Sequence, residues 1–163
     1  MRPNKGFTLI ELLVVIAIIG TLATLAVTAV NRARAGTRVA KAQADLKQLS
    51  TAIDILAIDA GEWPGHQVAY TICTDLPGGC PANNELEDLT TQAAGIVDTD
   101  GNFTAWKGPY MGQIPQDPWG HNYFFDTDYD TGGGTMRVVI GSYGPNGVGN
   151  NLYDADDVRL IIK

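Results

Sequence analysis

An apolar stretch dominates the first part of the chain. From Leu12 to Val30 no side chain is charged, which is about the length that crosses the hydrocarbon core of a bilayer as an α-helix. A short leader containing Arg2 and Lys5 precedes this run, and Glu11 stands at its start. Because a carboxylate inside a membrane segment is costly, it usually marks a function. We therefore expect a membrane-competent helix in which Glu11 has a specific role.

The helical pattern continues beyond the apolar stretch, but only one face remains apolar. Apolar residues recur at steps of three and four with polar residues between them, which is typical of an amphipathic helix. This stripe comprises Val39, Ala42, Leu46, Leu49, Ile53, Leu56 and Ala60. Gly61 and Pro64 predict a left-handed cap and the end of the helix. A helix from Phe7 to Ala60 would measure about 80 Å. Since a globule of this size cannot bury such a helix, its first half has to lie in lipid or against other copies.

The residues around Gly6 resemble the start of type IV prepilins and pseudopilins. Lys5-Gly6-Phe7-Thr8-Leu9-Ile10-Glu11 combines a basic leader, a glycine, a phenylalanine and an isolated glutamate. The resemblance implies cleavage after Gly6 by a prepilin peptidase and N-methylation of Phe7. A cleaved secretory signal is the competing interpretation, but its apolar core would not contain Glu11.

The same resemblance implies an assembly role for Phe7 and Glu11. In a bundle of such helices the new amine at Phe7 of one subunit can meet Glu11 of a neighbour away from water, where a charge pair depends on good geometry. The alternatives are that Glu11 snorkels to the membrane surface or is paired within its own chain. Many relatives carry a kinking proline at the position of Thr28, whereas this chain has no proline between Pro3 and Pro64. Any local unwinding of the packed helix would therefore fall at Gly20, or it would not occur.

Beyond Gly61 the pattern indicates strands and irregular loops. The segments 122–125 and 136–140 predict two strands joined by a polar turn, and Asn84 predicts the cap of a short helix around 84–95. The resulting fold class is α+β, a pilin-like fold with a long N-terminal α-helix packed on a small antiparallel β-sheet with irregular loops. The expected organisation is a leader peptide at 1–6, a transmembrane or filament-core half-helix at 7–30, an amphipathic half-helix at 31–61 and an extracytoplasmic head at 62–163.

A second landmark lies in the head. In Asp117-Pro118-Trp119-Gly120 the residue types fit a type I turn with the Asp117 side chain bonded back to the backbone. The turn should direct Trp119 onto the helix stripe. An Asp-Pro-Trp-Gly turn that leads into a strand resembles the major pseudopilin family of type II secretion systems, and most adhesive pilins lack it. The resemblance covers residues 6–64 and 106–158 and leaves 67–105 unmatched.

Cys73 and Cys80 are the two cysteines of the chain. In an oxidising compartment they should form one disulfide that closes a small loop and contributes about 2–3 kcal/mol. A redox couple is the alternative, but the pair lacks the two-residue spacing and the helix N-terminus that lower a thiol pKa.

The resemblance also implies a calcium site in the C-terminal loop. Calcium takes six to eight hard oxygen ligands, and this loop is rich in glycine and carboxylates. By position, the ligands would be the carbonyls of Tyr143 and Val148 and the side chains of Asn146, Asp154 and Asp157. Asn146 stands where relatives usually have aspartate. The alternative is an acidic loop held by hydrogen bonds alone.

Charge is distributed unevenly. The chain has 18 acidic and 11 basic residues, for a net charge of -7, and every acidic residue except Glu11 and Asp45 follows Leu49. A basic cluster precedes that point: Arg32, Arg34, Arg38, Lys41 and Lys47. An acidic head argues against nucleic-acid binding. Attraction between the head and the basic helix of another copy, and a merely solvated acidic surface, remain alternatives.

Catalytic motifs are not found. His66 and His121 lie in turn-like segments, and no phosphate loop, nucleophile elbow or Cys/His metal spacing occurs in the sequence. The acidic clusters at 126–130 and 98–102 begin like calcium loops but lack the glycine and the bidentate acid of an EF-hand, so we predict turns. We therefore predict that the chain is not an enzyme.

These observations predict a structural subunit that polymerises into a type II secretion pseudopilus-like filament after cleavage and N-methylation. The resemblance implies as partners further copies of the chain, a prepilin peptidase, an inner-membrane assembly platform, minor pseudopilins and, before assembly, the membrane. The chain would first span the inner membrane once with an extracytoplasmic head, and later lie in a periplasmic or cell-surface filament. The alternatives are a type IV pilus subunit for adhesion, motility or DNA uptake, and a membrane-anchored binding protein that never polymerises.

Overall fold

Helix α1 (Leu9–Ala60) is the main element of the computed structural model, which describes residues 6–80, 84–149 and 155–163. It begins two residues later than predicted and ends at the predicted residue, where Gly61 has a φ of 73° and its N–H bonds to the Ala57 carbonyl at 2.9 Å. The helix is continuous through Gly20 and Gly36. The chain divides into two compact units, Met1–Thr37 and Arg38–Lys163.

The first unit consists of α1 up to Thr37 and the few residues before the helix. All of its described residues are exposed, including the large apolar side chains of the predicted membrane stretch. By length and composition α1 is long and apolar enough to cross a membrane. Among the described residues 6–37, the first half of the helix therefore has no apolar partner within its own unit.

In the second unit, the rest of α1 packs on the head through one face. The predicted stripe is buried from Ala42 to Leu56, while Val39 at its start is 37% exposed. Ala52 and Ala57, which the spacing did not include, are also buried. Small side chains there widen the face that the head can cover.

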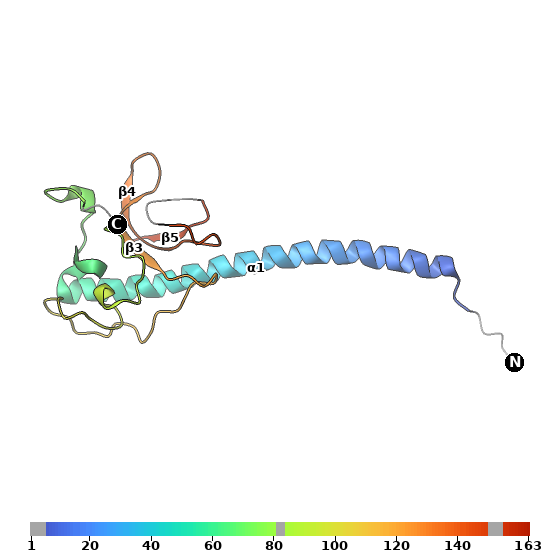
Figure 1. The fold of residues 1–163 in the computed structure, drawn as a ribbon, viewed down its shortest axis with the longest axis horizontal. Helices are drawn as coiled ribbons and strands as arrows, with labels where there is room; N and C mark the ends of the chain where they lie inside the picture. The colour runs from blue at the N-terminus through green and yellow to red at the C-terminus, as the bar shows by residue number, and fades with distance from the viewer. Residues whose placement is uncertain (1–5, 81–83, 150–154) are drawn as a thin grey trace. The chain divides into compact units, whose positions relative to one another are not determined.

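A three-stranded antiparallel sheet lies beside this half of α1 (Figure 1). Its order is β3 (Phe124–Asp130), β4 (Met136–Ser142), β5 (Val158–Ile161). The first two strands confirm the predicted hairpin, with a shorter turn than expected, and β5 was not predicted. A two-stranded sheet of β1 (Glu62–Trp63) and β2 (Gln67–Val68) follows the helix, and 3-10 turns occupy Pro64–His66, Cys73–Asp75 and Gln92–Ala94.

The helix predicted around 84–95 is wrong. Leu86 instead forms an isolated bridge with Phe125, with backbone hydrogen bonds of 2.8 and 2.9 Å in the two directions. The Leu89 N–H bonds to the Tyr123 carbonyl at 3.1 Å. Because their backbone groups pair with the strand region, Leu86 and Leu89 cannot use them in a helix, and only the 3-10 turn at Gln92–Ala94 remains.

Aromatic side chains fill the space between helix and sheet. Trp63, Tyr123 and Phe125 are fully buried and belong to the same core cluster as the helix stripe. The rings of Trp63 and Phe125 lie edge to face with centroids 5.8 Å apart, a favourable aromatic geometry. Trp119 packs against this cluster, which includes most of the helix stripe toward which its turn was predicted to direct it.

Candidate functional site

Glu11 closes the N-terminus of α1. Its Oε2 accepts hydrogen bonds from the Thr8 N–H and the Thr8 hydroxyl, both at 2.8 Å, and the Thr8 Oγ1 accepts from the Glu11 N–H at 3.3 Å. This reciprocal arrangement is a capping box, which satisfies backbone donors that a helix start leaves open. In the single chain Glu11 is therefore paired with its own Thr8. The contact with a neighbour's amine concerns a second copy and stays a prediction.

Glu11 is surrounded by exposed apolar side chains. Together with it, Phe7, Ile10, Val14 and Val15 line a depression on the helix surface. Phe7, directly after Gly6, is 89% exposed. The cleavage and methylation site predicted at Gly6 and Phe7 thus precedes the helix and is accessible.

The Asp117 turn has the predicted geometry. The Gly120 N–H bonds to the Asp117 carbonyl at 3.0 Å, and Gly120 takes a φ of 96° that favours glycine. Asp117 Oδ1 accepts from the Trp119 and His121 N–H groups at 2.9 and 2.8 Å. Its Oδ2 accepts from the hydroxyl of Ser142, the last residue of β4. One carboxylate, 4% exposed, therefore holds the turn together and fixes it to the sheet.

Two carboxylates on α1 attach the head to the helix. The Tyr123 hydroxyl donates to Asp45 at 2.9 Å, and Lys107 pairs with Asp59 at 2.9 Å. Burial, and then the hydrogen bond to Asp45, raise the pKa of Tyr123 far above its usual value, so the phenol remains a donor. These contacts explain two acidic residues on a helix whose other charges are mostly basic.

The C-terminal loop brings together part of the predicted calcium set. Asn146 donates from its N–H and its Nδ2 to the two carboxylate oxygens of Asp156, at 3.2 and 2.7 Å, and its Oδ1 accepts from the Val148 N–H at 2.7 Å. Asp157 instead accepts from the Tyr129 hydroxyl at 2.6 Å. The predicted ligand Asp154 lies outside the described residues.

Asp156 was not predicted, yet it is the carboxylate that accepts hydrogen bonds from Asn146. The position in the sequence had pointed to Asp157 instead. The signal available was only that the two carboxylates are adjacent in the sequence. Gly144 takes a φ of 64°, and a Cβ there would clash with the Asp156 carbonyl oxygen. The described loop thus offers amide, carboxylate and backbone oxygens at close approach, donors that suit calcium by type. Within the described ranges, no group of three His, Cys, Asp or Glu side chains is placed to hold a metal ion.

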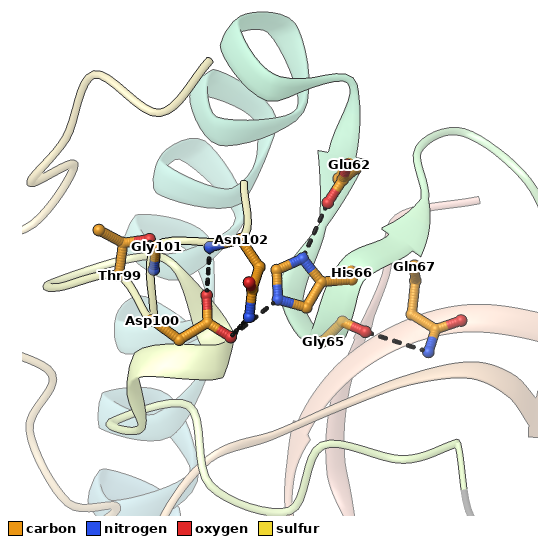
Figure 2. Close-up of polar contacts among 8 residues, drawn as sticks. All are labelled: Glu62, Gly65, His66, Gln67, Thr99, Asp100, Gly101 and Asn102. Atoms are coloured by element: carbon orange, nitrogen blue, oxygen red, sulfur yellow. Dashed lines mark hydrogen bonds and ion pairs between the residues drawn. The ribbon is translucent and has the colours of Figure 1, made fainter. Parts of the chain in front are cut away.

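His66 links the loop around Asp100 to Glu62 of β1, the strand that follows α1 (Figure 2). Its Nδ1 lies 2.9 Å from Glu62 Oε2, its Nε2 lies 3.1 Å from Asp100 Oδ2, and its ring lies on Phe103 with centroids 4.1 Å apart. Burial lowers the pKa of His66, but the bonds to Glu62 and Asp100 outweigh burial and raise it above its usual value. With a carboxylate on each ring nitrogen, the imidazole acts as a link between two acidic segments.

Cys73 and Cys80 are bonded to each other, as predicted, with Cα atoms 5.2 Å apart. They tie the ends of an exposed loop that follows the two-stranded sheet. The disulfide lies apart in sequence from every candidate site above.

The sequence matches two family models. Residues 1–27 match the prokaryotic N-terminal methylation motif, and residues 29–160 match protein G of the type II secretion system. The chain belongs to the type II secretion system protein G family. This membership confirms the resemblance drawn from the Gly6 region and from the Asp-Pro-Trp-Gly turn. The match also runs through 67–105, the segment left unmatched above.

Individual relatives include a type II secretion protein and a type IV fimbrial protein. The type II secretion system core protein G of Klebsiella pneumoniae is 30% identical over 151 residues, which cover 91% of this chain and 89% of that protein. The type IV major fimbrial protein FimA of Dichelobacter nodosus is 34% identical over 112 residues, 64% of this chain and 72% of that protein. A crystal structure of the major pseudopilin of enterohaemorrhagic Escherichia coli is similar at 21% identity and a TM-score of 0.47, covering 77% of this chain and 83% of that one. Since the protein G match extends over nearly the whole chain, a secretion pseudopilin is favoured over a pilus subunit.

Proposed function

We propose that this protein is the subunit that polymerises into the pseudopilus of a type II secretion system, after cleavage behind Gly6 and N-methylation of Phe7. The observation that carries the proposal is the exposed surface of residues 6–37, which include the first half of α1. Every described residue there is exposed, and Glu11 is the only charged residue from position 6 to Asn31. Membership of the protein G family and the match to the methylation motif support it.

The driving force for assembly in the membrane differs from the hydrophobic burial that folds the core of a soluble domain. In the membrane, lipid covers apolar side chains as well as protein does, so helices associate through close packing and polar contacts. A carboxylate in a membrane segment is costly, by up to about 3 kcal/mol at the centre of the helix. A neighbour's terminal amine beside Glu11 removes part of this cost and favours one axial register between subunits.

The partners and the location follow from this role. Before assembly the chain spans the inner membrane once with an extracytoplasmic head, and a prepilin peptidase processes it there. An inner-membrane platform and minor pseudopilins then add subunits to a filament in the periplasm or at the cell surface. The acidic head interacts with protein and not with nucleic acid.

We also propose that the C-terminal loop binds calcium. Asn146 and Asp157 would supply side-chain oxygens, Tyr143 and Val148 would supply carbonyls, and Asp154 would complete the set. The oxygen-only donors and the close approach at Gly144 support this assignment. Bound calcium would neutralise carboxylates and hold the loop beside the start of β5.

Replacing Glu11 tests the assembly role. Glu11→Ala should leave a processed, methylated subunit that accumulates in the membrane, with no filaments in sheared surface material by electron microscopy and with lost secretion. The matched control is Glu87→Ala, which removes an exposed carboxylate from the head and should assemble normally. Normal filaments from Glu11→Ala would refute the role of the carboxylate. A processed wild-type chain that never assembles would instead support the membrane-anchored binding protein.

A further inference from the structure

Strand β3 contains a buried carboxylate, Asp126, and a half-buried one two residues further on, Asp128, and the assembly role uses neither of them. Asp126 is 1% exposed, and its Oδ1 accepts the Asp128 N–H at 2.7 Å. One further oxygen on each residue, Asp126 Oδ2 and Asp128 Oδ1, is buried and has no hydrogen-bond partner in the described structure. Such oxygens are costly, because burial removes the water that would solvate them.

A β-bulge sets this arrangement. Asp126 pairs with Val139 and Tyr129 with Arg137, so β3 carries one extra residue over this interval. Opposite Asp126, therefore, strand β4 offers the uncharged Val139. The bulge places both carboxylates on a short stretch of one strand, where Asp126 Oδ2 and Asp128 Oδ1 have no donor in the described structure.

A separate segment, residues 84–86, lies along the same part of β3. Leu86 bridges Phe125, and the Asn84 Nδ2 donates to the Thr127 hydroxyl at 2.9 Å. This segment also brings Glu85 toward the pair. The charged groups that face Asp126 in the described structure are therefore Asp128 on its own strand and Glu85 on this segment, and both are acidic.

One bound proton would reduce the repulsion between these neighbouring carboxylates. If one of two adjacent carboxyl groups is protonated, its O–H donates to the other, and one negative charge leaves the buried site. We propose that Asp126 and Asp128 hold one proton between them at neutral pH, and that this proton keeps segment 84–86 fastened to β3. Burial, and also Asp128 and Glu85, raise the pKa of Asp126 to about 8.

Loss of the proton would have a local consequence. Three carboxylates would then face one another where 84–86 meets the bulge. Because β3 is an outer strand of its sheet, weaker attachment of 84–86 would uncover backbone groups of a sheet edge. The site would thus make the covering of that edge dependent on pH.

The sign of the pH dependence follows from linkage. A carboxyl whose pKa in the folded protein is raised takes up a proton on folding. Its contribution to stability is complete below the usual aspartate pKa and is lost as pH rises toward about 8. For one proton, the folding equilibrium constant should fall about tenfold per pH unit within that window and level off above it.

Infrared spectroscopy of the full-length protein in detergent tests the proposal directly. The wild type should show a protonated-carboxyl band at about pH 6.5 that disappears with a midpoint near about pH 8. Asp126→Asn should lack the band. The matched control Asp130→Asn removes a carboxylate of the same strand that bonds to the Gly132 and Gly134 N–H groups, and it should keep the band.

Guanidinium unfolding from about pH 6 to 8 gives a second readout, with a pH slope in the wild type and in Asp130→Asn that Asp126→Asn lacks. Absence of the band from wild-type protein at about pH 6.5 would overturn the proposal, whether or not Asp126→Asn folds. A band that appears only after chelation of calcium would also overturn it, because a cation would then take the place of the proton.

Discussion

Replacement of Asp117 by alanine should destabilise the head severely. The carboxylate accepts two backbone N–H groups and the Ser142 hydroxyl in a site that is 4% exposed. Hydrogen bonds to charged groups contribute about 1.5–3 kcal/mol each, and buried donors left unpaired cost a similar amount. Allowing for overlap between these terms, we expect a loss of about 4 kcal/mol, which is a large part of the stability of a typical domain.

Guanidinium unfolding of the full-length protein in detergent, followed by tryptophan fluorescence, measures this loss. Asp117→Asn keeps an oxygen for the Trp119 and His121 N–H groups and should lose about half as much. Asp88→Ala is the control, because Asp88 also accepts two hydrogen bonds from Thr90, at 2.8 and 2.6 Å, but at an exposed turn. Its loss should stay below about 1 kcal/mol. Equal losses for Asp117→Ala and Asp88→Ala would refute the reasoning that burial sets the magnitude.

Three further variants test other parts of the structure. His66→Gln should increase hydrogen exchange in the loop around Asp100 at low pH and remove its pH dependence, because the protonated link of the wild type is lost as pH rises through the raised pKa of His66; unchanged exchange would contradict this. Leu49→Ala, at a fully buried position, should cost about 2–5 kcal/mol in chemical unfolding, and a loss below about 1 kcal/mol would exclude close packing there. Asp157→Asn should abolish the rise in melting temperature on adding calcium, whereas the exposed-site control Asp75→Asn should keep it; a wild type that calcium does not stabilise would rule out the loop site.

Local patterns predicted the features that depend on neighbours in sequence. The end of α1 at Gly61, the turn at Asp117 and the hairpin of β3 and β4 each follow from residue types within a few positions. The capping box of Thr8 and Glu11 also follows from residue types three positions apart. It was not predicted, because Glu11 was interpreted as a charge in a membrane segment and not as part of a helix cap.

Features that depend on residues far apart in the sequence could not be predicted from local patterns. Leu86 lies in a stretch suited to a helix, yet its backbone pairs with Phe125 because β3 has an open edge beside it. His66 meets Asp100 across 34 positions, so no spacing rule links them. In the C-terminal loop the choice between Asp156 and Asp157 depends on the bend at Gly144, which brings the Asp156 carbonyl close.

The capping box at the start of α1 has a consequence for maturation. Thr8 and Glu11 both follow Gly6, so the proposed cleavage would leave the helix start intact and change only what stands in front of it. The new feature is a positive amine one residue before the cap, at the end of a helix that already carries partial positive charge. The proposed processing would therefore add positive charge to a helix end that is already partly positive. An acidic group on an adjoining molecule would relieve this repulsion, so that maturation itself would favour assembly.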